Sequence, residues 1–283
     1  MKIKTRMHLF LITAVLNFST ICAYAQKNEK YAEMPAMIKQ IKLNGDTALA
    51  KNVALNYINN YLFKNRKYLL TRENLGLMRQ YLISEHTKAF KYFFKNRAKI
   101  NEIIGENSAE YAIKEVIRKA YLPKNETWKV SRPDWDNLEK KLTKRFGSLG
   151  QETVFSGRLM YSLDIGDWDS YGKYYILYFE KALKRPDFIV NNMSWYLFEN
   201  VNEQKALHFA CDVVMVYAIK EWYQTDPGAF DTYANLLYKV GRVTEAIEWQ
   251  KKAVEIAKNT PHEDENKSHL EKMLRGERTW LAH

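Results

Sequence analysis

The chain has 283 residues and carries 44 lysines and arginines against 33 aspartates and glutamates, for a formal net charge of +11. Its 11 glycines and 6 prolines are scattered, and no stretch of alternating apolar and polar residues is bounded by hairpin turns, which speaks against a β-sheet protein. Of its two cysteines, Cys22 lies in a leader expected to be removed. The remaining Cys211 excludes an internal disulfide and a CxxC redox pair.

The first 25 residues have the features of a secretory signal peptide. Three basic residues precede an apolar run over residues 9–16, and Ala23-Tyr24-Ala25 supplies the small residues that signal peptidase requires. The run is too short to cross roughly 30 Å of hydrocarbon. We therefore expect cleavage after Ala25 and a periplasmic or secreted chain of 258 residues, with a charge of +8 and no transmembrane segment.

The positive charge of an exported chain speaks against nucleic acid as a partner. It is compatible with a negatively charged envelope surface, with an acidic partner, or with simple solubility.

Beyond an N-terminal extension over residues 26–45, apolar residues recur at helical spacing and predict a helical subdomain over residues 46–122. Residues 122–134 hold two prolines, and their apolar residues show no helical spacing. We therefore expect them to connect to a second subdomain over residues 134–283. The predicted helices lie near residues 46–64, 72–83, 87–103, 108–121, 135–146, 151–163, 168–184, 191–200, 203–223, 228–240, 243–258 and 266–275.

Helix starts carry recurring capping signals. Asp134 and Asp167 each precede a Trp-Asp pair at an interval of 33 residues, and Asp226 precedes a proline suited to a first helical turn. Ser108 is expected to cap the helix near residues 108–121. Within the helix near residues 168–184, Tyr171, Tyr174, Tyr175 and Tyr178 form a stripe, which we interpret as core with some hydroxyls reaching a groove or the surface.

The segment Phe230 to Lys258 places small and bulky residues as a helical hairpin requires. Ala234, Ala246 and Ala253 are small where two antiparallel helices approach, and Gly241 falls in the turn. The pattern resembles a tetratricopeptide repeat. The sequence therefore predicts an all-α protein built as an irregular array of tetratricopeptide-like helical hairpins.

The resemblance extends to a family. The segments Asn191–Trp195, Lys205–Leu207, Asp231–Lys239 and Leu270–Leu274, together with Tyr57–Leu62, are similar to the helical C-terminal region of bacterial exported thioredoxin-like proteins. In that family a thioredoxin domain precedes the helices. Here only residues 26–45 lie in that place, which is too short for a βαβ redox fold, and no CxxC exists. The family's oxidoreductase activity is therefore not carried over, and a stand-alone binding module or a decayed relative is implied.

Motifs that carry chemistry are incomplete. In His262-Glu263-Asp264-Glu265-Asn266 an asparagine stands where a zinc-protease motif needs its second histidine, and Ser170-Tyr171-Gly172-Lys173 lacks the companion motifs of serine acylases. We predict no catalytic residues, no cofactor and no metal site.

The candidate binding surface is the groove formed by the first helices of the hairpins. The residues expected to face outward there and to hold a peptide are Asn191, Ser194, Asp231, Asn235, Tyr238 and Lys239.

The sequence thus predicts a non-enzymatic binder of a protein or peptide in the cell envelope. One alternative is an accessory subunit of a separately encoded thioredoxin-like oxidoreductase. The other is a membrane-surface or cell-wall binder that uses helix 87–103, where Lys88, Lys91, Lys95 and Lys99 lie beside three phenylalanines. An ordinary amphipathic helix with its aromatic side in the core has the same pattern.

Overall fold

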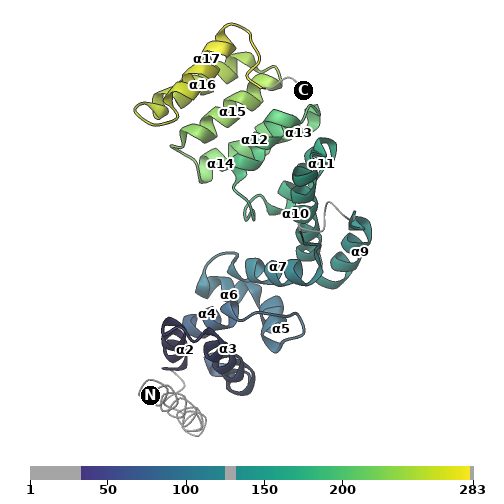
Figure 1. Cartoon of the computed structure of the whole chain (residues 1–283), viewed down its shortest axis with the longest axis vertical. Coiled ribbons are helices and arrows are strands. Elements are labelled where there is room, and N and C mark those ends of the chain that lie inside the picture. The colour runs from purple at the N-terminus through teal and green to yellow at the C-terminus, as the bar shows by residue number, and fades with distance from the viewer. Residues whose placement is uncertain (1–32, 125–131, 281–283) are drawn as a thin grey trace, which may run out of the picture. The chain divides into compact units, whose positions relative to one another are not determined.

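The computed structural model describes residues 33–124 and 132–280, and every regular element among them is a helix (Figure 1). The all-α prediction is confirmed for this part of the chain. The predicted signal peptide and most of the predicted connection over residues 122–134 lie outside the described residues.

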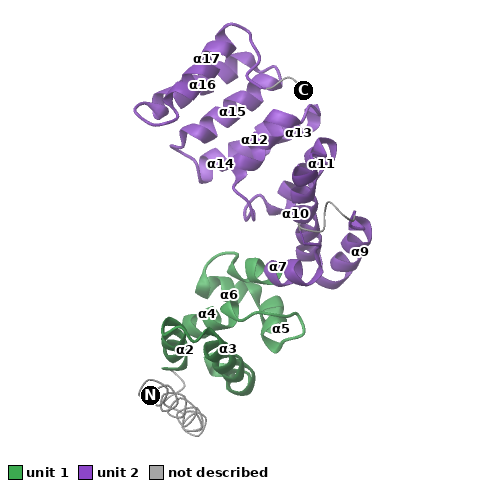
Figure 2. Cartoon of the chain, in the orientation of Figure 1, with its two compact units in different colours: residues 1–113 green, residues 114–283 purple. Residues whose placement is uncertain are grey.

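The chain divides into two compact units, residues 1–113 and residues 114–283 (Figure 2). The division falls inside helix α7 (Ser108–Tyr121), whereas the sequence suggested a separation at residues 122–134.

The first unit is a small bundle with its own core. Helix α2 packs against α3, α4 packs against α6, and α5 packs against the π-helical segment η2. The elements are α2 (Met34–Leu43), α3 (Thr47–Asn56), η2 (Tyr57–Leu62), η3 (Arg66–Tyr68), α4 (Arg72–Gln80), α5 (Lys88–Lys95), α6 (Arg97–Ile104) and the start of α7. Helix α2 lies where the sequence analysis predicted no helix.

The predicted basic helix 87–103 is two helices, because the chain breaks at Asn96, whose side-chain amide donates to the carbonyl of Tyr92 at 2.8 Å. Phe90 and Phe93 are buried, at 4% and 0% exposure, while the four lysines are exposed. The aromatic side of this segment is therefore core.

The second unit is a succession of packed helical pairs. Neighbours along the chain pack together at α9–α10, α10–α11, α15–α16 and α16–α17, and α12 also packs against α15. After the end of α7, its elements are α9 (Trp135–Phe146), α10 (Ser148–Ile165), α11 (Trp168–Ala182), α12 (Val190–Asn200), α13 (Gln204–Phe209), η4 (Ala210–Met215), α14 (Val216–Glu221), α15 (Pro227–Lys239), α16 (Val243–Ala257) and α17 (Glu263–Leu274).

The predicted caps of α9, α11 and α15 are confirmed. The carboxylates of Asp134 and Asp167 each accept a backbone N–H at 3.1 Å, and that of Asp226 accepts the N–H of Gly228 at 2.9 Å. The predicted cap at Ser108 is wrong, because its hydroxyl donates back to the carbonyl of Ile104 at 3.2 Å. The side chain of Asn101 instead accepts the N–H of Ala109 at 2.9 Å.

The tyrosine stripe of α11 is core, as predicted, and its four residues are 0–8% exposed. Its hydroxyls do not reach a groove. Tyr171 donates to the carbonyl of Met193 at 2.9 Å, Tyr175 bonds the hydroxyl of Ser194 at 2.7 Å, Tyr178 accepts the N–H of Asp187, and Tyr174 accepts from Arg158. The buried hydroxyls thus tie α11 to α12, to the loop before α12, and to α10.

Candidate functional site

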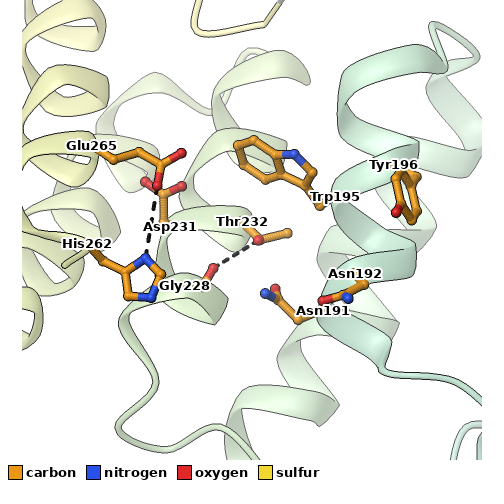
Figure 3. Close-up of a pocket in the computed structure, with 9 residues that line it drawn as sticks. All are labelled: Asn191, Asn192, Trp195, Tyr196, Gly228, Asp231, Thr232, His262 and Glu265. Carbon is orange, nitrogen blue, oxygen red and sulfur yellow. Dashed lines mark hydrogen bonds and ion pairs between the residues drawn. The ribbon is translucent and has the colours of Figure 1, made fainter. Parts of the chain in front are cut away.

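A pocket of about 310 Å³ lies between α12 and the N-terminal turns of α15 and α17 (Figure 3). The residues that line it are Asn191, Asn192, Trp195, Tyr196, Gly228, Asp231, Thr232, His262 and Glu265. In Figure 3, Asn191 and Trp195 project from α12 towards α15, and the carboxylates of Asp231 and Glu265 lie on the opposite side.

Helical spacing places these side chains. Asn191 and Trp195 are four residues apart on α12, and Gly228 and Thr232 are four apart on α15, so each pair shares a helix face. The first turn of α15 is fixed by Pro227 and by the Asp226 cap. Within that turn the hydroxyl of Thr232 donates to the carbonyl of Gly228 at 2.9 Å. The α15 wall of the pocket is therefore locally ordered.

Gly228 keeps space open between α12 and α15. A Cβ placed on it would lie 3.8 Å from Nδ2 of Asn191 and 3.4 Å from Oδ1 of Asp226, which are ordinary van der Waals contacts. A larger residue would therefore fit the backbone and take up room in the pocket.

Asp231 connects the pocket to a buried polar network. Its Oδ1 accepts Nε2 of Gln250 at 2.6 Å and contacts Nδ1 of His269 at 2.8 Å. The Nδ1–H tautomer of His269 donates to this oxygen. Asp231 and His269 are only 5% and 8% exposed, so the contact joins α15 to α17 in the interior.

The network continues through the side-chain amide of Asn235 and a second hydrogen bond of Gln250. Nδ2 of Asn235 donates to the carbonyl of Asp231 at 2.9 Å, and Nε2 of Gln250 also donates to the carbonyl of Asn266 at 3.1 Å. Asn235 and Gln250 are fully buried. These groups hold the three helices in register behind the pocket.

Two oxygen acceptors at the pocket receive no hydrogen bond from the described residues. Oδ1 of Asn191 is buried and has no hydrogen-bond partner. Asp231 is bonded through Oδ1, and no described residue donates to its Oδ2. Buried polar atoms in folded proteins are nearly always paired, so Oδ1 of Asn191 is a place for a hydrogen-bond donor from outside the chain.

Trp195 forms the aromatic wall. Its ring centroid lies 5.0 Å from that of Phe198 and 6.0 Å from that of His269, which fixes the orientation of the indole. Tyr196 is 37% exposed at the rim.

The six candidate residues from the sequence separate into three groups. Asn191 and Asp231 line the pocket. Ser194 and Asn235 are 0% exposed, and with Asp231 at 5% the prediction that these three side chains face outward is wrong. The reason is that α17 covers this side of α15, and that α11 supplies a partner for Ser194.

Tyr238 and Lys239 lie at the C-terminal end of α15 and are partly buried. The ammonium of Lys239 donates to the carbonyl of Phe198 at 2.5 Å and lies 5.4 Å from the ring centroid of Trp280. Burial lowers the pKa of Lys239 to about 8. Tyr238 contacts the same indole, with ring centroids 6.2 Å apart. Lys239 therefore satisfies an internal carbonyl at the end of α12.

Sequence reasoning missed Trp195, Thr232, His262 and Glu265 as lining residues. One signal was present: Gln250 follows Ala246 by four residues and precedes Ala253 by three, so a polar side chain lies on the small-residue seam of α16. A polar group in such a seam indicates a buried network.

A second, larger pocket of about 610 Å³ lies along α9 and the start of α10, lined by Asp136, Glu139, Lys140, Thr143, Lys144 and Gln151. Its charges are mixed and partly satisfied within the chain. Asp136 pairs with Arg158, and Gln151 donates to Glu139 at 3.1 Å. This pocket presents no consistent charge to a ligand.

Other reactive groups are few in the described part of the chain. Its histidine, cysteine and acidic side chains form no group of three placed to hold a metal ion. Cys211 is fully buried, and burial raises the pKa of its thiol to about 12, which keeps the sulfur protonated and unreactive.

Comparison with known proteins gives no family: no family model matches the chain, and no curated protein or solved structure matches it either. Among residues 33–124 and 132–280, no helix is long and apolar enough to cross a membrane.

Proposed function

We propose that this chain is an exported, non-catalytic helical-repeat protein that binds a peptide segment of a partner protein in the cell envelope. The peptide would enter the pocket formed by α12, α15 and α17. Export is supported by the basic, apolar and small-residue sequence of residues 1–25.

The open acceptors carry the proposal. Oδ1 of Asn191 is buried without a partner at a pocket that the carboxylate of Asp231 also lines. Leaving a buried acceptor unpaired costs about 1–3 kcal/mol, and a ligand that supplies N–H groups recovers this loss. A pocket of about 310 Å³ lies at the small end of ligand pockets and suits one or two side chains of a peptide.

The sequence resemblance supports the kind of partner. From the sequence we interpret segments of α12, α15 and α17 as similar to the helical region of exported thioredoxin-like proteins, and a separately encoded thioredoxin-like protein is a candidate on that interpretation alone. No family model, curated protein or solved structure matches the chain. In that case the chain would act as an accessory subunit of an oxidoreductase, with the redox chemistry carried by the partner.

Site-specific crosslinking tests the proposal. A photo-crosslinking amino acid at Tyr196, on the pocket rim, should join the chain starting at Gln26 to a partner in envelope extract. The matched control is Leu274, which is 61% exposed and about 14 Å further along α17 than Glu265. Asn191→Ala should reduce the crosslink at Tyr196. Equal crosslinks from both positions, unaffected by Asn191→Ala, would rule out the pocket.

A second candidate function rests on the exposed lysines. Lys88, Lys91, Lys95 and Lys99 are all exposed on α5 and α6, and a basic helical surface of this kind attracts anionic lipid or cell-wall polymer. Sedimentation with vesicles containing phosphatidylglycerol tests it. Binding that disappears at 0.5 M salt and in a Lys88→Gln, Lys91→Gln, Lys95→Gln variant would favour this function over peptide binding.

A further inference from the structure

We propose that the pocket formed by α12, α15 and α17 recognises a positively charged nitrogen group of a peptide, such as a lysine ammonium, an arginine guanidinium or a free amino terminus. The inference rests on the proposed peptide-binding function and specifies the chemistry of what is bound. It is carried by the charge, the open hydrogen-bond acceptors and the aromatic wall of the pocket.

The charge of the lining is the first step. Asp231 and Glu265 contribute two carboxylates, and the nine lining residues include no lysine or arginine. The chain as a whole has a net charge of +11. The pocket is therefore an acidic site on a basic protein, and its carboxylates attract cations.

The second step is the supply of acceptors. Asp231 is 5% exposed, with Oδ1 held by Gln250 and His269 and with no described donor to Oδ2. Oδ1 of Asn191 is buried and without a partner on the other side of the pocket. An ammonium or guanidinium carries several N–H donors and no acceptor, so it suits a site whose available groups are oxygens. Such charge-assisted hydrogen bonds are stronger than neutral ones.

The third step is the indole of Trp195. Cations attract aromatic faces, and the chain already uses this contact, because Lys252 lies 4.1 Å from the ring centroid of Trp249 and Lys239 lies 5.4 Å from that of Trp280. Trp195 has no such cation among the described residues. A cation in the pocket would make with the Trp195 ring the contact that lysines of the chain make with other tryptophan rings.

The fourth step is that the site is held in position before a ligand arrives. Gln250 and His269 fix one oxygen of Asp231, and Phe198 and His269 pack against Trp195. Little side-chain freedom is lost on binding, which favours affinity for a small group.

The test uses short peptides and the indole N–H signal of Trp195 in NMR spectra of the chain starting at Gln26, assigned with Trp195→Phe. Four acetylated and amidated tripeptides carry lysine, arginine, norleucine or glutamate between two alanines. An unacetylated trialanine amide tests the amino terminus. We expect the lysine, the arginine or the free-amine peptide to shift the Trp195 signal with at least tenfold tighter binding than the norleucine and glutamate peptides.

Charge-neutral variants locate the effect. Glu265→Gln and Asp231→Asn should each weaken the cationic peptide about tenfold, whereas Glu271→Gln, exposed on the same helix six residues further on, should leave affinity within twofold. Glu265 is 59% exposed as a side chain, so its substitution does not threaten folding.

The outcomes separate the two proposals. If the norleucine or glutamate peptide binds as tightly as the cationic ones, the pocket binds peptides but the cation inference is wrong. If no peptide shifts the Trp195 signal, the cation inference is also wrong, and the crosslinking from Tyr196 then decides whether the pocket binds any partner.

Discussion

The carboxylate of Asp231 on α15 and the imidazole of His269 on α17 lie 2.8 Å apart, although 38 residues separate them in the chain. Both are nearly buried, and Gln250 of α16 bonds the same carboxylate oxygen. One oxygen thus joins three successive helices, and it does so directly behind the pocket. Stability of the C-terminal helices and the shape of the candidate site are therefore coupled.

His269→Ala should destabilise the second unit by about 1.5–3 kcal/mol, because it leaves a buried carboxylate without one of its donors. Urea denaturation followed by circular dichroism measures the change. His208→Ala is the control, since His208 is exposed on α13 and should change the unfolding free energy by less than about 0.5 kcal/mol. Equal effects of the two substitutions would contradict a structural role for the Asp231–His269 contact.

Glu152→Gln should be among the most destabilising single changes in the chain. Glu152 is 0% exposed, and its two oxygens accept Nζ of Lys114 and a guanidinium nitrogen of Arg185, each at 2.6 Å. Removing the charge takes this carboxylate from the buried ammonium of Lys114 and from the partly buried guanidinium of Arg185, at a cost of about 3–5 kcal/mol. Differential scanning calorimetry checks this against Glu248→Gln, an exposed glutamate of α16. A melting temperature shared by both variants would show that the buried ion pairs contribute nothing.

Lys239 should make stability depend on pH. Burial lowers the pKa of Lys239 to about 8 in the folded chain, from an ordinary value of 10.5. Between these values the unfolded state binds more protons than the folded state, so the free energy of unfolding rises with pH. Between pH 7.5 and pH 10 the free energy of unfolding of the wild type should therefore increase relative to that of the Lys239→Met variant. The gain should be on the order of 1 kcal/mol, because solvent screens the partly exposed ammonium. A difference between the two proteins that does not change over this range would refute the assignment.

Cys211 should be inert in the folded protein. Its thiol is fully buried in the π-helical segment η4, and its pKa of about 12 keeps the sulfur protonated at pH 8. A chain starting at Gln26 should show no reaction with Ellman's reagent under native conditions, and one thiol in 6 M guanidinium. Rapid labelling of the native protein at pH 8 would mean that the helix opens at η4.

Gly228→Ala should separate binding from folding. The added methyl group meets only ordinary contacts, and alanine stabilises a helix by up to about 1 kcal/mol relative to glycine, so the melting temperature should not fall. The methyl group takes up room beside Asn191, so affinity for a pocket ligand should fall several-fold. Peptide titration monitored by the Trp195 signal measures it, and unchanged affinity would place the ligand elsewhere.

Local signals in the sequence were sufficient for much of the fold. The boundaries of α9 over residues 135–146 follow from the Asp134 cap and the apolar period, and the α15–α16 hairpin follows from Ala234, Ala246, Ala253 and Gly241. Helix caps, turns and hydrophobic periodicity depend on residues within about one helical turn of each other, so they can be recognised from the sequence alone. Helix α2 was missed because its short apolar pattern lies within a stretch interpreted as an extension.

Only part of the candidate site could be predicted from the sequence in this way. The sequence by itself determined that α12 and α15 carry polar residues at helical spacing, and that the chain is all-helical and basic. It did not determine which polar side chains face solvent. Asn235 and Asp231 lie four residues apart on one helix face and are 0% and 5% exposed, yet only Asp231 also lines the pocket. Tertiary packing alone decided this, since the burial of a polar group depends on donors that arrive from helices about 20–40 residues away in the chain.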